Sequence, residues 1–219
     1  MTSLWSKLQN KHRGETGLVI GNGPSLKDIP LDFLKKYPSF GTNRIYMLDS
    51  FTPTYFVAVN PLVIEQFNWD INKMDCTKFI TAFYTQHLLT DAIPLYSSVV
   101  PCFSREPEKF VYEGYTVTYV CLQLAFFMGF TTILLVGVDH KYEFEGYPNQ
   151  LVVAEGDDVN HFHPDYFGDG RRWHLPDLVQ SERAYRMAKT VFDMDGRSIV
   201  NLTPESALNV FERGDVKEW

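Results

Sequence analysis

The chain has 219 residues, of which 45% are hydrophobic and 15% aromatic, and its formal net charge is −7. A chain of this size buries roughly 70% of the surface of its unfolded form, so it needs no disulfides to form a core. We expect one domain over residues 1–219. The acidic balance disfavours a nucleic-acid-binding surface.

The cysteines and the apolar segments also exclude several protein classes. Cys76, Cys102 and Cys121 are widely spaced and odd in number, which suits a reducing cytoplasm and gives no disulfide framework. The N-terminus lacks the apolar core of a signal peptide. Polar residues and Gly129 interrupt the apolar region 117–138, so a helix followed by the strand "TTILLVGV" explains it better than a membrane span. We expect a cytoplasmic protein without a transmembrane segment, with peripheral attachment to the inner face of a membrane left open.

Short apolar runs predict strands along the chain, and periodic segments between them predict helices. The expected strands are 17–21, 39–43, 54–59, 78–83, 97–102, 132–137 and 197–201. The expected helices are 61–68, 116–129, 181–193 and 204–211, the last with Thr203 as N-cap and Pro204 as its first residue.

Alternating strands and helices predict an α/β fold, a Rossmann-like three-layer sandwich around a mainly parallel sheet. Ligands of such sheets bind beyond the carboxyl ends of the strands. Four polar segments follow predicted strands and should converge there: Gly21–Ser25, Asn43-Arg44, Asn60-Pro61 and Gly137–His140. The segment of about 140–180 has little periodicity and many His, Asp, Gly and aromatic residues, which is typical of a lid.

The stretch "LVIGNGPSLKDIP" carries a glycine turn after the first strand. It matches neither G-x-G-x-x-G nor the P-loop pattern. Gly21 and Gly23 let the backbone approach a ligand, while Asn22 and Ser25 add side-chain donors. A tight turn without a ligand is the alternative. With the other polar strand ends nearby, we favour a phosphate or nucleotide.

Asn43, Asn60 and Asp139 each follow a predicted strand. An Asn amide offers a donor and an acceptor, which suits ribose hydroxyls or a base edge, and Asp139 could bind ribose or orient a loop. Turn or helix-cap roles are the alternative for both Asn residues. Arg44 could pair with a phosphate, although an ordinary surface ion pair is equally consistent.

Three histidines lie in the window "VNHFHPDYFGDGRRWHLP", namely His161, His163 and His174. A zinc site would need further ligands at fitting positions, so a neutral imidazole acting as general base is the preferred interpretation. The alternative is that these histidines lie in a surface loop and have no catalytic or binding role. His174 follows the flexible turn 168–170, which could swing "RRWH" over a ligand, so we expect His174 to be the base, with His163 as second choice.

Asp193-Met194-Asp195 has the D-x-D form that binds a metal-nucleotide complex in many glycosyltransferases. It stands at a predicted helix end, remote from any strand end, so we interpret it as a helix terminus. We expect no metal site.

Four blocks in order, "VIGNGPSLKDI", "GTNRIY", "YFVAVNPLVIEQF" and "TVTYVCLQLAFFMGFTTILLVGVDHKY", resemble the Campylobacter-type sialyltransferases. They resemble at least as closely the MptE-like family (6-hydroxymethylpterin pyrophosphokinase-like), whose members often accompany surface-polysaccharide genes. The resemblance covers roughly residues 17–211. Both families imply a Rossmann-like fold that binds a nucleotide at the glycine turn.

The sialyltransferase resemblance implies a cytidine-monophosphate (CMP) sugar donor and no metal. It implies that Asn22, Ser25 and Asn43 hold the CMP, with Asn60 beside the donor. It further implies that Tyr142 and Tyr147 stabilise the leaving phosphate, and that His174 or His163 takes the proton of the acceptor. The sialyltransferases carry an arginine where this chain has Gly114.

Three functions follow as hypotheses. The first is a metal-independent glycosyltransferase that uses a nucleotide-activated sugar and a glycan or lipid-linked acceptor, without a cofactor. The second is a pyrophosphokinase that moves diphosphate from ATP to a pterin alcohol, with Mg²⁺ near Asp139, Asp157 and Asp158. The third is a non-catalytic nucleotide-binding module. A homo-oligomer is compatible with each.

Overall fold

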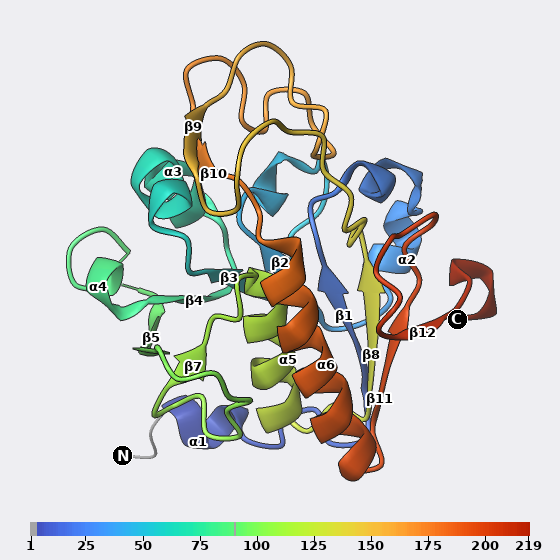
Figure 1. Cartoon of the computed structure of the whole chain (residues 1–219). Helices are drawn as coiled ribbons and strands as arrows, with labels where there is room; N and C mark the ends of the chain where they lie inside the picture. The colour runs from blue at the N-terminus through green and yellow to red at the C-terminus, as the bar shows by residue number, and fades with distance from the viewer. Residues whose placement is uncertain (1–3, 90) are drawn as a thin grey trace.

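The computed structural model describes residues 4–89 and 91–219. Its main feature is an eight-stranded sheet in the order β12-β11-β8-β1-β2-β3-β4-β5, in which every pairing is parallel (Figure 1). The strands are β1 (Thr16–Ile20), β2 (Ser39–Thr42), β3 (Tyr55–Ala58), β4 (Thr77–Thr81), β5 (Ile93–Leu95), β8 (Thr132–Val136), β11 (Ser198–Asn201) and β12 (Glu212–Arg213).

The strands are apolar at consecutive positions because both faces of the sheet are covered. Alternate residues of β1 enter different cores: Leu18 and Ile20 pack into one, and Val19 packs into the other. Such alternation follows from the two-residue period of a strand. The sheet is therefore the middle layer of a three-layer α/β sandwich, as the sequence predicts.

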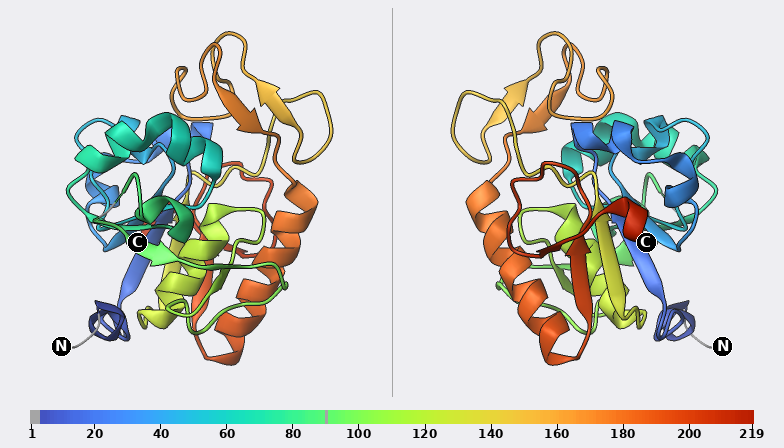
Figure 2. Two further views of the ribbon diagram at one scale, coloured as in Figure 1. Left: turned by 90° about the vertical axis from the view of Figure 1, so that its left-hand side faces the viewer. Right: turned by 90° about the vertical axis from the view of Figure 1, so that its right-hand side faces the viewer.

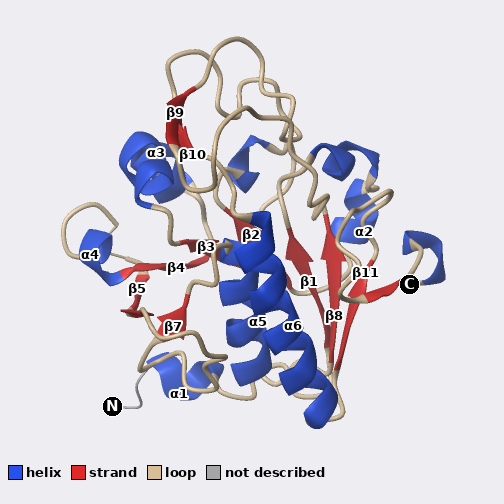
Figure 3. Ribbon diagram, in the orientation of Figure 1, coloured by secondary structure: helices blue, strands red, loops and turns tan. Residues whose placement is uncertain are grey.

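Helices α1 (Leu4–Leu8), α5 (Val117–Phe127) and α6 (Leu178–Met194) contribute to one core, and α2 (Leu31–Leu34) and α3 (Pro61–Lys73) contribute to the other. Helix α5 is buried nearly all round: it packs on β1, β2 and β3 and lies beside α6, which packs on β11 (Figure 3). The short helix α4 (Ala82–Thr85) follows β4. Single 3₁₀ turns occupy Pro24–Asp28, Ile45–Met47 and Val216–Glu218.

The chain order around β1 creates the place where a ligand is expected. Strand β1 is flanked by β2 on one side and by β8 on the other, so the chain leaves β1 toward β2 and leaves β8 in the opposite direction, toward β11. In open parallel sheets a crevice forms at such a switch point, outside the carboxyl ends of the two strands. The residues that follow β1 and β8 are Gly21–Ser25 and Gly137–His140.

The segment between β8 and α6 rises above this edge of the sheet (Figure 2). It contains a small antiparallel hairpin of β9 (Leu151–Val153) and β10 (Arg172–His174). We call residues 140–176 the lid. Its position agrees with the lid that the sequence predicts over about 140–180.

Two predicted elements are wrong. Residues 204–211 form turns rather than a helix, because Glu205 adopts a left-handed φ of +51° and Thr203 accepts a hydrogen bond from the Val138 amide instead of capping a helix. The expected strand 97–102 is also absent from the main sheet. Its first two residues form β6 (Ser97–Ser98), which pairs with β7 (Val111–Tyr112) in a separate ladder, and β5 provides the sheet edge instead.

The apolar region 117–138 divides as expected into helix α5 and strand β8, with Gly129 at a left-handed φ of +88° between them. Within the described residues, no helix has the length and apolar character that a membrane crossing requires.

Candidate functional site

A cavity of about 730 Å³ opens at the carboxyl edge of the sheet, beneath the lid. Residues from all four predicted polar strand ends line it: Gly21, Asn22, Gly23, Asn43, Asn60, Pro61, Gly137, Asp139 and His140. The topology thus brings together segments that are more than 100 residues apart in sequence. A cavity of this volume suits a ligand of nucleotide size.

The two glycines of the turn are needed for close packing. A Cβ at Gly21 would collide with the carbonyl of Gly137, and a Cβ at Gly23 would collide with the Asp139 carboxylate. The loops after β1 and β8 therefore touch backbone to backbone. In the same place Ser25 donates from its amide (3.2 Å) and its hydroxyl (2.7 Å) to Asp139.

Ser25 consequently lies behind the cavity rather than in its lining, and its donors are already paired. The segment after the turn is a 3₁₀ turn of five residues, not the longer helix that phosphate sites use. Burial raises the pKa of Asp139, and the hydrogen bonds from Ser25 oppose that rise. The glycine turn therefore holds Asp139 in place. Asn22 is the residue of the turn whose side chain faces the cavity.

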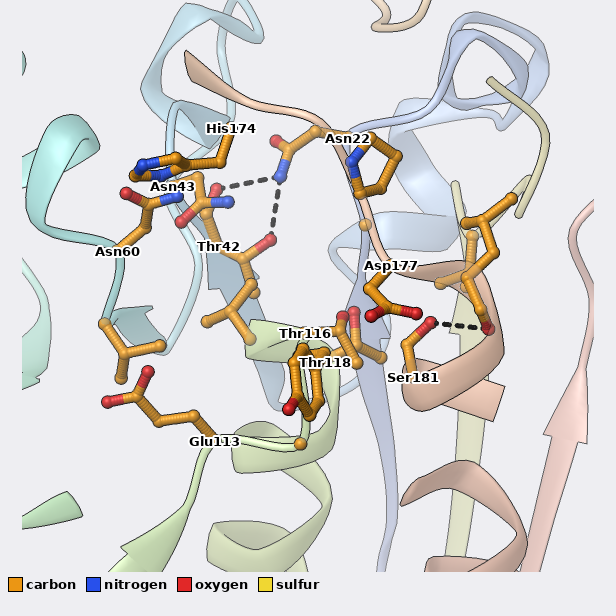
Figure 4. Close-up of a pocket in the computed structure, with 18 of the residues that line it drawn as sticks. Asn22, Thr42, Asn43, Asn60, Glu113, Thr116, Thr118, His174, Asp177 and Ser181 are labelled. Carbon is orange, nitrogen blue, oxygen red and sulfur yellow. Dashed lines mark hydrogen bonds between the residues drawn. The ribbon is translucent and has the colours of Figure 1, made fainter. Parts of the chain in front are cut away.

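Asn22 is 8% exposed and lies at the end of β1. Its Nδ2 group donates to the Thr42 carbonyl (3.1 Å) and to the Thr42 hydroxyl (2.8 Å), as Figure 4 shows. Its Oδ1 atom is buried and accepts no hydrogen bond from any residue that the structure describes. Leaving a buried acceptor unpaired costs about 1–3 kcal/mol, so such an atom in a cavity wall indicates a missing donor.

Asn43 presents a second atom of this kind at the end of β2. Its backbone has a left-handed φ of +49°, and its Oδ1 atom is also buried, with no partner in the described part of the chain. Asn60 differs, because its Oδ1 accepts from the Leu62 amide (2.9 Å) and so caps α3. The helix-cap interpretation is thus correct for the Asn60 oxygen, and no described residue accepts from its Nδ2 group.

Three long helices begin at the cavity wall. Their N-cap residues Asn60 (α3), Thr116 (α5) and Asp177 (α6) all belong to its lining. A helix N-terminus carries a partial positive charge of roughly half an elementary charge. This arrangement favours an anionic ligand in a protein whose net charge is negative.

His174 lines the cavity from β10, as Asn43 and Asn60 do from the ends of β2 and β3 (Figure 4). It is solvent-exposed, and its ring makes no hydrogen bond with the described residues. Tyr142 and Lys141 line the cavity from the start of the lid. Burial raises the pKa of Tyr142, so its hydroxyl is a proton donor at neutral pH.

Two expected catalytic side chains lie elsewhere. His163 is outside the cavity lining, and its Nδ1 accepts from the Asp165 amide (3.1 Å). Tyr147 is 68% exposed and also lies outside the lining. The structure therefore brings His174 and Tyr142 to the cavity and leaves His163 and Tyr147 away from it.

Arg44 fastens the lid rather than facing a ligand. Its Nη1 donates to the carbonyls of Asp165 (2.8 Å) and Tyr166, and its guanidinium lies 3.8 Å above the Phe67 ring. The Phe162 amide donates to the Asn22 carbonyl (2.9 Å). The lid is thus tied directly to the ends of β1 and β2.

Of the three acidic residues expected near a magnesium ion, two accept hydrogen bonds within the protein, and Asp157 is solvent-exposed and outside the cavity lining. Asp139 accepts from Ser25, and Asp158 accepts from His161 Nδ1 (2.8 Å). Burial raises the pKa of Asp158, but the hydrogen bonds from His161 and from two amides outweigh it and leave the pKa below its ordinary value. The described residues include no group of three or more His, Cys, Asp or Glu side chains placed to hold a metal ion. Both oxygens of Asp139 and of Asp158 accept hydrogen bonds, so these two carboxylates as they stand do not fit a bound Mg²⁺.

Sequence reasoning missed several lining residues, among them Lys141, Glu113, Tyr115, Thr116, Asp177 and Ser181. Asp177 and Thr116 could have been recognised from the sequence as N-cap residues, because each stands just before a periodic helix. Glu113 and Tyr115 come from an irregular connection, which no local pattern connects to the strand ends. Burial lowers the pKa of His140, so its ring is neutral at pH 7.

One family of known proteins matches this sequence over residues 1–145, and it is described as 6-hydroxymethylpterin diphosphokinase MptE-like. The chain belongs to this MptE-like family. The match spans the glycine turn, the Asn43 and Asn60 strand ends, α5 and β8. It ends within the lid, so His174 lies beyond it.

Two solved structures share the fold. The Maf glycosyltransferase from Magnetospirillum magneticum AMB-1 superposes with a TM-score of 0.63 at 12% identity, covering 97% of this chain and 35% of that one. The sialyltransferase CstII from Campylobacter jejuni, solved with the substrate analogue cytidine-5'-monophosphate, superposes with a TM-score of 0.55 at 18% identity, covering 93% and 86%. This chain spans about a third of the Maf protein. No curated protein matches the sequence.

Proposed function

We propose that this MptE-like protein is a glycosyltransferase that uses a CMP-linked sugar as its donor. The observation that carries the proposal is the pair of buried, unpaired amide oxygens of Asn22 and Asn43 at the switch point of the sheet. A cytidine nucleotide supplies matching donors, since its base carries an amino group and its ribose carries hydroxyls. Binding such donors would remove the cost of two unpaired buried acceptors.

The fold supports the same donor class. The likeness to the sialyltransferase covers most of both chains, and that protein was solved with cytidine-5'-monophosphate. The N-termini of α3, α5 and α6 at the cavity wall, together with Lys141, favour a phosphate there. These features are independent of the two amide oxygens.

The lining residues can perform glycosyl transfer without a metal. His174 takes the proton of the acceptor hydroxyl, whose oxygen forms a bond to the anomeric carbon of the donor sugar. The bond from that carbon to the phosphate oxygen breaks, and its electron pair stays on the departing CMP. The Tyr142 hydroxyl and the Lys141 ammonium donate hydrogen bonds to the phosphate as its charge grows.

The family description gives one alternative, diphosphate transfer from ATP to a pterin alcohol. That reaction normally needs Mg²⁺ held by carboxylates, and two of the expected ligands, Asp139 and Asp158, already accept hydrogen bonds from Ser25 and His161. We therefore rank it second. Mass spectrometry after incubation with ATP, Mg²⁺ and 6-hydroxymethyl-dihydropterin decides it, since formation of AMP and a pterin diphosphate would establish it.

Isothermal titration calorimetry with CMP, UMP, AMP and GMP tests the proposal. We expect CMP to bind at least about tenfold more tightly than AMP or GMP. Asn43→Gly keeps the left-handed backbone but removes the acceptor, and we expect it to weaken CMP binding by about tenfold. Asn43→Asp keeps an acceptor oxygen and is the matched control.

Two outcomes contradict the donor assignment. One is the absence of binding for CMP and for CMP-linked sugars, and the other is an unchanged CMP affinity in Asn43→Gly. Tight CMP binding without turnover of any CMP-linked sugar would instead identify a nucleotide-binding module.

A further inference from the structure

The cavity extends beyond Asn22 and Asn43, where we propose that the nucleotide binds, to a second group of residues. The nucleotide donor gives these residues no role. Glu113 and Tyr115 line it from the connection between β7 and α5, and Ser97 and Val99 line it from the segment after β5. In Figure 4 the Glu113 carboxylate points into the cavity, well apart from Asn22. We call Ser97, Val99, Glu113 and Tyr115 the outer subsite.

Glu113 differs from the other two carboxylates in the lining. Asp139 is held by Ser25, and Asp177 caps α6 by accepting from the Gln180 amide. Among the described residues, the Glu113 carboxylate accepts from the Ser97 hydroxyl and from no backbone amide or cation, while its backbone carbonyl accepts from the Thr116 amide. Burial raises the pKa of Glu113, and the Ser97 hydrogen bond opposes the rise. Its carboxylate therefore has acceptor capacity left for a ligand.

Tyr115 supplies a flat apolar surface beside that acceptor. Its side chain is 50% exposed, and it makes neither a hydrogen bond nor a ring contact with the described residues. Its backbone has a left-handed φ of +61°, an unusual conformation for an aromatic residue. Val99, which is 93% exposed, extends the apolar rim.

The charges around the outer subsite determine which class of acceptor substrate can bind there. The described lining residues include one lysine and no arginine, and the lysine, Lys141, stands at the lid end, where it also lines a smaller cavity with Pro24 and Glu143. A carboxylated or phosphorylated group beside Glu113 would meet a like charge without a compensating cation. A neutral pyranose fits, because its hydroxyls can donate to Glu113 and its C–H face can stack on the Tyr115 ring.

We propose that Glu113 and Tyr115 form the acceptor subsite, and that the acceptor there is a neutral glycan. This inference rests on the proposed glycosyltransferase function. It assigns the acceptor class by charge: a sugar without carboxylate, phosphate or sulfate.

A glycan array tests it with fluorescently labelled protein in saturating CMP. The array presents oligosaccharides that end in galactose, glucose or N-acetylglucosamine beside matched ones that end in sialic or glucuronic acid. We expect binding to the neutral set alone. Glu113→Gln and Tyr115→Ala should weaken it at least about tenfold, while Tyr115→Phe retains it. Glu106→Gln and Tyr96→Ala, which alter exposed residues outside the cavity, are the matched controls.

Calorimetry with CMP on every variant separates the two proposals. If CMP fails to bind the wild-type protein, the donor assignment fails. If CMP binds but carboxylated glycans are preferred, or no glycan binds, the acceptor assignment is overturned. Unchanged glycan binding in both Glu113→Gln and Tyr115→Ala would overturn it as well.

Discussion

The three asparagines at the strand ends show how context decides what one residue type does. The Asn60 oxygen accepts from the Leu62 amide, so it is a helix cap. The Asn22 and Asn43 oxygens have no donor among residues 4–89 and 91–219, although both are buried. Of the three, only the Asn22 and Asn43 oxygens therefore need a hydrogen-bond donor that a ligand could supply.

His174 is the residue whose substitution should separate chemistry from binding. We expect His174→Ala to lower CMP release from the best CMP-linked donor at least about 10²-fold, because the acceptor proton then has no base. CMP affinity should change less than about twofold, since the amide oxygens are intact. Steady-state kinetics and calorimetry on the same preparation measure both.

His163→Ala is the informative comparison, because that histidine lies outside the cavity. Retained turnover in His174→Ala, together with lost turnover in His163→Ala, would make His163 the base and contradict our assignment. An equal loss of CMP affinity in His174→Ala would make His174 a binding residue.

At the scale of elements, the lid depends on one arginine for its place above the sheet. Arg44 bonds two lid carbonyls and packs on Phe67. A lysine keeps the charge but cannot reproduce the planar fork. We expect Arg44→Lys to increase amide hydrogen exchange across residues 158–168 by about tenfold or more, and to raise the KM for the donor.

Hydrogen-exchange mass spectrometry measures this change, with Arg186→Lys on the exposed surface of α6 as control. Unaltered exchange in the lid of Arg44→Lys would show that the Phe162–Asn22 hydrogen bond and the aromatic packing suffice to hold it.

Elements governed by local pattern could be predicted from the sequence, and those governed by distant contacts could not. The parallel strands and helices α3, α5 and α6 follow from apolar runs and periodicity. The segment 204–211 carries good local helix signals, yet Ser206 donates to the Val138 carbonyl (2.6 Å) and the Ala207 amide donates to the Asp139 carbonyl (2.8 Å). These bonds to the loop after β8 replace helical ones.

The residues of the candidate site also fall into those that the sequence could predict and those that depend on distant contacts. The strand-end residues Asn22, Asn43 and Asn60 were accessible because parallel strands end at one edge. The pairing of Ser25 with Asp139 joins residues 114 positions apart, and no spacing rule reveals it. Glu113 and Tyr115 were missed for the same reason, since their connection is irregular and the fold alone brings it to the cavity.

At the scale of the whole molecule, the sheet order determines where binding is possible. The strand order reverses at β1, and a crevice opens there. The carboxyl ends of the parallel strands lie at this crevice, and α3, α5 and α6 begin around it. A chain with a net charge of −7 can thereby attract an anionic ligand at one place. The lid completes the cavity and contributes His174 and Tyr142.

A crystal structure of the protein with CMP tests the central claim most directly. We expect CMP between the ends of β1 and β2, with donors of its base and ribose within hydrogen-bond distance of Asn22 Oδ1 and Asn43 Oδ1. Its phosphate should lie toward Tyr142 and Lys141. CMP bound elsewhere, or bound while both amide oxygens remain unpaired, would contradict the claim.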